Sequence, residues 1–361
     1  MHRLFAETQV DLGDRIHAQI AANFESHGSV SSFDPKAAVR MEITPELALR
    51  GSVQTTMRTP SVDDLNEDLS TSLEYVFEAG IYKALDTKGD SELMPERALT
   101  YNFGATVRLP RLRATVDYWS YDFRDVIDVL PAGGVTALYA AGGDSLAAVQ
   151  KLVTCPDGRG TGTCHVSALE RIEVSYVNWP GIELSGIDWH LSARFPVGGG
   201  ADGAPRRARV VSLGTSGTYL EEFYVRALDV PGTDIEIFDS LSAVGQLNWY
   251  NPIAPPLPRL KSRFTVGYHI GDYSAVSYAN MVSGYTNEAH DDPDLQPVDG
   301  FVTIDLSMLR RSRSAVDVAV SILNVLDSPP PLVFWEQSYD GFTHSPKGRR
   351  IKMTLTWRPE G

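Results

Sequence analysis

Apolar and polar residues alternate along several segments of the chain. Between positions 99 and 109, the odd positions hold Leu, Tyr, Phe, Ala, Val and Leu, and the even positions hold Thr, Asn, Gly, Thr and Arg. Strict alternation over about ten residues predicts a β-strand with one apolar and one polar face. The same alternation recurs at 187–195, 260–269, 302–308 and 351–357, and more weakly at 16–24, 37–43, 47–57, 112–118, 211–219 and 316–322.

The connections between these segments alternate in length. Short ones lie at 11–15, 44–46, 110, 270–272 and 310–314, with a longer, glycine-rich one at 196–205. Long ones lie at 25–35, 58–97, 127–170, 226–257, 287–300 and 326–348. Alternation of tight periplasmic turns with long outer loops is typical of a membrane β-barrel. Residues 144–153 have helical spacing, so we expect a short helix inside one long loop.

A soluble β-sandwich is the main alternative, because its strands also alternate. Soluble strands are usually about five or six residues long, and structureless loops beyond about 15 residues are uncommon in compact domains. The strands expected here are about twice that length, and several connections are longer than such loops. The pattern therefore favours an all-β fold, an antiparallel transmembrane β-barrel with about thirteen strands, long extracellular loops and short periplasmic turns.

The charge balance excludes one class of partner. The chain has 32 Lys and Arg against 46 Asp and Glu, a formal net charge of −14, whereas binding of nucleic acid requires a basic face. No apolar stretch reaches the roughly 18 residues of a membrane helix, but a barrel strand exposes only every second residue to lipid. The N-terminus shows no basic region followed by an apolar core, so no signal peptide is predicted.

The two cysteines, Cys155 and Cys164, flank a segment rich in the turn-forming residue Gly. They either form a loop disulfide in an oxidising compartment or remain two thiols in a reducing one. The disulfide is favoured, because a metal site would require more ligands nearby.

No set of residues indicates catalysis, so we expect neither an enzyme nor a cofactor. The glycines at 158–162 lack the Lys-Ser/Thr ending of a phosphate-binding loop. The histidines are scattered, and the acidic run at 290–294 is better explained as a solvated loop than as a cation site. No metal is therefore expected.

Several short motifs occur in an order that resembles the barrel of TonB-dependent receptors. They are DPKAAVR at 34–40, LRGS at 49–52, MRTPS at 57–61, LMPE at 93–96, VDYW at 116–119, GIELSGID at 181–188 and ILNVLDSPP at 322–330. The third differs at its first and third residues from the commonest family form, Phe-Arg-Ala-Pro-Ser. Together the motifs span almost the whole chain.

This resemblance implies an outer-membrane protein of a Gram-negative bacterium. A complete receptor has 22 strands and a plugged lumen, so residues 1–361 would supply about thirteen of them, from strand ten to the last, with no plug domain. The implied function is TonB-coupled uptake of a scarce ligand, such as a siderophore, cobalamin or an oligosaccharide. The implied partners are outer-membrane lipid, a small-molecule ligand, and TonB only through the missing plug segment.

Two other functions compete with uptake. The chain could form a passive, porin-like barrel without a plug, or, less consistently with its pattern, a soluble carbohydrate-binding β-protein. The DNA upstream of the first codon distinguishes a receptor from a passive barrel, because a receptor requires an in-frame sequence that encodes the plug. Expression without detergent tests the soluble alternative, because a lipid-facing stripe should make the chain insoluble.

Ligand contacts are expected from the long loops. The candidates are Arg58 in the third motif and the aromatic residues Trp179, Trp249, Tyr250, Trp335 and Tyr339, which could stack on a ligand or simply pack within the loops. The segment 63–96 carries ten acidic residues against two lysines between its ends. Such a loop would repel an anionic ligand, which favours a neutral, sugar-like or cationic one.

Overall fold

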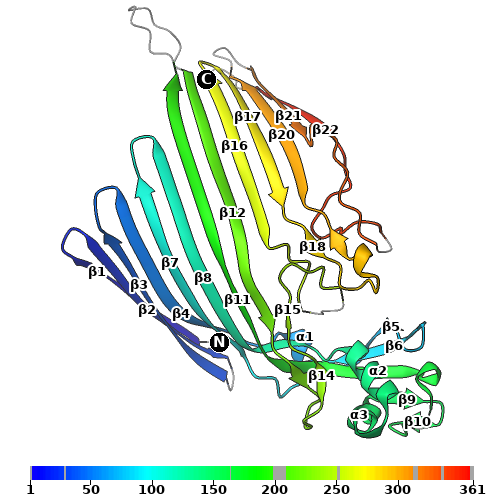
Figure 1. Cartoon of the computed structure of the whole chain (residues 1–361). Helices are drawn as coiled ribbons and strands as arrows, with labels where there is room; N and C mark the ends of the chain where they lie inside the picture. Colours follow the sequence, from blue (N-terminus) through cyan, green and yellow to red (C-terminus); the bar gives the residue numbers. More distant parts are fainter. Residues whose placement is uncertain are drawn as a thin grey trace, which may run out of the picture.

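A computed structural model describes residues 2–27, 30–162, 164–197, 209–249, 253–311, 316–334 and 337–357. Within them, thirteen long strands form one curved sheet (Figure 1). They are β1 (His2–Leu12), β2 (Ile16–His27), β3 (Val30–Glu42), β4 (Leu47–Arg58), β7 (Glu96–Arg108), β8 (Leu112–Val129), β11 (Arg171–Val197), β12 (Arg209–Val225), β16 (Leu260–Ile270), β17 (Tyr273–Val282), β20 (Phe301–Arg310), β21 (Val316–Leu323) and β22 (Arg350–Trp357).

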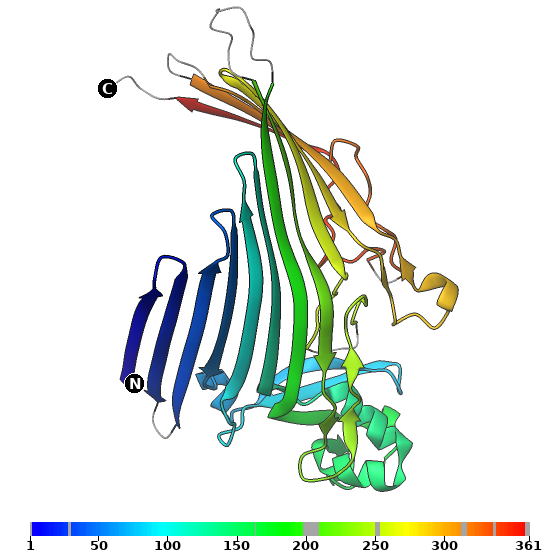
Figure 2. The same cartoon turned by 60° about the vertical axis from the view of Figure 1, so that its left-hand side comes forward.

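Each of these strands pairs in antiparallel fashion with the next one in that order. The prediction of an all-β, antiparallel sheet is confirmed. Among the described residues β1 and β22 do not pair with each other, and the sheet remains open between its blue and red edges (Figure 2).

One predicted loop is wrong. Residues 25–35 were expected to form a long connection, but β2 continues to His27 and β3 begins at Val30. The register continues through Phe24 opposite Phe33 to His27 opposite Val30. The Ser-rich composition of this segment resembles a loop, but its described residues pair without a break.

The register explains why one face of the sheet is apolar. Gly51, Phe103, Tyr118, Ile187 and Tyr219 lie directly opposite one another across β4, β7, β8, β11 and β12, and directly paired residues share a face. Phe103 is nevertheless 61% exposed. A row of exposed aromatic and aliphatic side chains is unfavourable in water and suits contact with lipid.

The opposite face is polar and cross-linked by charge. Arg50 donates from Nε and Nη2 to the two carboxylate oxygens of Asp117, at 2.7 and 2.5 Å. Gly104 lies between them in the register, and a Cβ atom there would overlap the Asp117 carboxylate. Glycine at this position therefore leaves space for an ion pair that spans the intervening strand β7.

The long connections gather at one end of the sheet. A disulfide subdomain forms there from β5 (Ser70–Val76), β6 (Ile81–Lys88), α2 (Ala132–Ala141), α3 (Gly143–Val149), η1 (Gln150–Leu152), β9 (Val153–Cys155), β10 (Gly158–Arg159), η2 (Val166–Ala168) and the start of β11 (Figure 1). Its buried apolar core includes Val135, Tyr139, Val149, Ile172 and Trp179. The helix expected at 144–153 corresponds to α3 and η1.

The remaining elements are short. They are α1 (Val62–Leu65), β13 (Leu228–Asp229), β14 (Glu236–Phe238), β15 (Leu241–Ser242), β18 (Tyr285–Thr286), η3 (Pro293–Leu295) and β19 (Pro297–Val298). None of the helices in the described ranges has the length and apolar character needed to cross a membrane.

Candidate functional site

A hollow of ≈ 640 Å³ lies at the long-connection end of the sheet. We call it the outer hollow. Its walls come from the loop that follows β15 and the loop that follows β21. The lining residues are Leu247, Asn248, Trp249, Ala254, Pro255, Pro256, Val333, Gln337, Tyr339, Asp340, Gly341 and Phe342.

Asn248 fixes the shape of the first wall. Its backbone φ is +57°, a conformation that Asn tolerates better than most residues. Its side-chain amide donates to the carbonyl oxygens of Ala243 at 2.8 Å and Pro255 at 2.9 Å. The carboxylate of Glu288 accepts from the backbone N–H groups of Leu247 at 3.1 Å and Trp249 at 2.7 Å. These bonds hold the backbone that presents the Trp249 ring.

Asp340 organises the second wall. One carboxylate oxygen accepts from the backbone N–H groups of Phe342 at 2.8 Å and Thr343 at 3.2 Å. The other accepts from the Tyr285 hydroxyl at 2.8 Å. Burial and the neighbouring Asp340 raise the pKa of Tyr285, so its phenol stays protonated and remains a donor. Asp340 thus ties the second loop to β18.

His344 lies beneath this wall. Its ring stacks on Tyr285 with centroids 6.1 Å apart and meets Phe301 edge-on at 5.2 Å. It is only 5% exposed, and neither ring nitrogen has a hydrogen-bond partner. Burial lowers the pKa of His344, and the positive charge of Lys261 adds to that effect, while the Asp340 carboxylate opposes it.

Acidification is therefore expected to loosen this loop. The unfolded loop binds a proton at His344 below about pH 6.5, but the folded one resists protonation, so stability is present above that pH and is lost as the pH falls below it. For each unit by which the pKa of His344 is lowered in the folded loop, the folding free energy of the loop weakens by about 1.4 kcal/mol at low pH. Hydrogen-exchange protection of residues 337–348, corrected for intrinsic rates, should fall between pH 7.5 and 5. The same fall in a His344→Phe variant would contradict this role.

The structure brings two sequence candidates together. Trp249 and Tyr339 line opposite walls of the outer hollow, and the Trp249 side chain is 42% exposed. Tyr250 and Trp335 lie outside the described residues. The hollow also contains Asn248 and Phe342, which sequence reasoning missed. Asn248 adjoins a candidate tryptophan, and Phe342 follows an Asp-Gly turn signal.

The other two candidates have structural partners. Trp179 is fully buried and packs edge-on against Phe238 with centroids 5.0 Å apart. Its ring faces are inside the core of the disulfide subdomain, so this structure offers them to no ligand. Arg58 makes two 2.6 Å hydrogen bonds to the carboxylate of Glu96. Its positive charge is therefore already paired within the protein.

The acidic segment 63–96 is partly neutralised by its surroundings. Arg171 donates to both carboxylate oxygens of Asp86, at 2.6 and 2.5 Å, and this pairing holds the pKa of Asp86 below its ordinary value. Glu96 pairs with Arg58. Residues of this segment do not line the outer hollow, so its repulsion of an anionic ligand remains a prediction.

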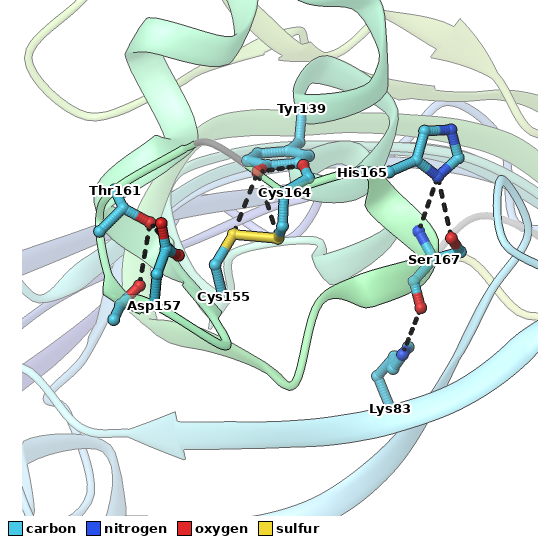
Figure 3. The surroundings of a disulfide bond; sticks show 9 residues. Lys83, Tyr139, Cys155, Asp157, Thr161, Cys164, His165 and Ser167 are labelled. Atoms are coloured by element: carbon cyan, nitrogen blue, oxygen red, sulfur yellow. Dashed lines mark hydrogen bonds between the residues drawn. A yellow bond between two sulfur atoms is a disulfide. The ribbon is translucent and has the colours of Figure 1, made fainter.

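Cys155 and Cys164 form a disulfide with Cα atoms 5.8 Å apart. Figure 3 shows the Tyr139 hydroxyl beside it, donating to the backbone carbonyl of Cys164 at 2.8 Å. The bridge closes the loop that leaves β9, and the hydrogen bond from Tyr139 links that loop to α2. No three His, Cys, Asp or Glu side chains within the described part of the chain cluster closely enough to hold a metal ion.

Comparison with known proteins gives a family match. The sequence model of a family described as TonB dependent receptor-like, beta-barrel, matches residues 2–325. No curated protein sequence matches the chain.

Several solved structures share the fold. A ferric enterobactin receptor of Pseudomonas aeruginosa aligns with a TM-score of 0.65 at 14% identity. The siderophore receptor PirA of Acinetobacter baumannii aligns at 0.63 and 15%, and the copper transporter OprC at 0.53 and 12%. Each alignment covers 98% of this chain but only 44%, 45% and 47% of the respective structure. The chain thus spans less than half the length of these proteins.

Proposed function

Because the chain belongs to the TonB-dependent receptor β-barrel family, we propose that it forms part of the barrel of a receptor that takes up a scarce ligand by TonB-coupled transport. Receptors of this family are outer-membrane proteins of Gram-negative bacteria. A siderophore, cobalamin or an oligosaccharide is the expected kind of ligand. Residues of the barrel wall would capture and guide that ligand, while TonB would act through the plug of the receptor.

The outer hollow is the observation that carries this proposal. It opens at the end of the sheet where the long connections gather, and two separate loops fix its walls through Asn248 and Asp340. Its volume lies within the range of about 300–1,000 Å³ found for small-molecule sites. In the membrane, the apolar face of the sheet would contact outer-membrane lipid and the polar face would line the lumen.

Uptake by cells tests the proposal. Cells that produce the full receptor containing this chain are given radiolabelled ferric enterobactin, cyanocobalamin or maltohexaose, one probe for each expected class. At least one probe should accumulate in cells with functional TonB and remain at background in an isogenic strain without it. Equal accumulation in both strains would indicate a passive pore and overturn TonB coupling. Failure of all three probes to accumulate would overturn uptake of these ligand classes.

A further inference from the structure

We propose that the outer hollow binds a neutral saccharide and rejects a polyanionic ferric siderophore. This inference rests on the proposed function, because it names the ligand class for the same site. Three properties of the hollow support it: aromatic rings on both walls, a fixed hydrogen-bond acceptor without a donor, and no basic side chain among the described residues that line it.

The aromatic rings provide apolar surfaces for stacking. Trp249 comes from one wall, and Tyr339 and Phe342 come from the other. Phe342 is 82% exposed, which is unfavourable for a large apolar ring in water. The flat faces of sugar rings carry C–H groups that pack on such aromatic surfaces, while the polar rims of the sugar stay free for hydrogen bonds.

Asn248 offers an acceptor to a hydroxyl group. Its Nδ2 donates to the carbonyl oxygens of Ala243 and Pro255, and these acceptors fix which side of the amide is nitrogen. Its Oδ1 is buried and has no hydrogen-bond partner. A buried acceptor without a donor is destabilising, and a ligand hydroxyl would satisfy it once a shift of this wall admits the hydroxyl to Oδ1.

The described residues that line the hollow include no Lys or Arg, and Asp340 is the one charged side chain among them. The basic residues of the two loops, Arg259, Lys347 and Arg349, lie outside this lining. Glu288 lies directly behind the Trp249 backbone. An anionic ligand would therefore meet negative charge without a basic group to bind it.

A cationic ligand fits the hydrogen-bonding groups of the hollow less well than a neutral one does. The carboxylate oxygens of Asp340 already accept from Tyr285, Phe342 and Thr343. These three donors stabilise the carboxylate, so little of its hydrogen-bonding capacity is left for an ammonium group. Hydroxyl groups, which need single donor or acceptor positions, fit the hollow better.

A binding experiment tests the ligand class. The full receptor in detergent is applied to an array of neutral oligosaccharides, and its affinity for ferric enterobactin is measured in parallel. At least one neutral oligosaccharide should bind, and Trp249→Ala and Phe342→Ala should each weaken that binding about 5- to 10-fold. Tyr82→Ala is the matched control, because Tyr82 is 63% exposed on β6, does not line the hollow, and should leave binding unchanged.

Each other outcome overturns the inference. Tighter binding of ferric enterobactin that depends on Trp249 would show that the hollow accepts a polyanion, while the proposed uptake function would stand. Preference for amine-bearing glycans in a second array would show a cationic ligand. Absence of binding to every neutral oligosaccharide would refute the saccharide class, and the uptake assay would then decide the receptor function separately.

Discussion

Replacement of Val266 by arginine is expected to destabilise insertion of the barrel by about 2–4 kcal/mol, the range measured for arginine at the bilayer midplane on the lipid face of barrel strands. Val266 lies near the middle of β16 and is 54% exposed. It pairs directly with Leu213 of β12, so the new guanidinium would enter an apolar row with no acidic neighbour in the register. The unfolding free energy of the full receptor, measured by urea titration in phospholipid vesicles, checks this expectation.

Thr265→Arg provides the matched control. Thr265 is adjacent in the same strand but belongs to the polar face. An arginine there would meet water and polar groups and should change stability by less than about 1 kcal/mol. Equal destabilisation by both variants would contradict the assignment of the two faces.

Removal of the disulfide is expected to destabilise the disulfide subdomain by about 2–3 kcal/mol, because the bridge closes a short loop in the unfolded chain. Cys155 and Cys164 are 9 residues apart in sequence, and both lie against the buried Tyr139. The Cys155→Ser, Cys164→Ser variant should therefore be cleaved faster by protease in this subdomain, while the sheet in the bilayer keeps its resistance.

Reduction provides an independent control for this result. Dithiothreitol should increase cleavage of the wild type and leave the double serine variant unchanged. Equal cleavage of the wild type with and without reductant would show that the packed core around Tyr139, and not the bridge, stabilises the subdomain.

The strands were largely predictable from the sequence. In β16, Phe264, Val266 and Tyr268 alternate with polar residues, as expected where only every second side chain meets lipid. That physical requirement is local, so the sequence displays it directly. The segment 25–35 was the exception, because polar residues at the end of a hairpin have the composition of a loop although their backbone still pairs.

The outer hollow was only partly predictable. Trp179 and Trp249 are the same residue type and both lie near long connections, yet one is buried in a core and the other lines the hollow. The difference arises from packing between distant segments, such as Trp179 against Phe238, and this contact leaves no periodic signal. The placement of Trp249 and Tyr339 around one hollow likewise depends on the tertiary packing of two loops.

The helix α2 could not be predicted from the sequence. It contains Gly133 and Gly134, and glycine is unfavourable within helices. A Cβ atom at Gly134 would overlap the backbone of Ile237. Tertiary packing therefore requires a residue that local propensity disfavours, and sequence reasoning accordingly missed the helix.

The central claim is that alternate residues of these strands face lipid and lumen in a membrane. Spin labels placed singly at positions 263–268 of β16 in the membrane-embedded receptor test it most directly, through their relative accessibility to oxygen and to a water-soluble nickel complex. Oxygen concentrates in lipid, so labels at 264, 266 and 268 should favour oxygen, while labels at 263, 265 and 267 should not. Accessibility without a period of two, or preference for the nickel complex at all six positions, would contradict a membrane barrel.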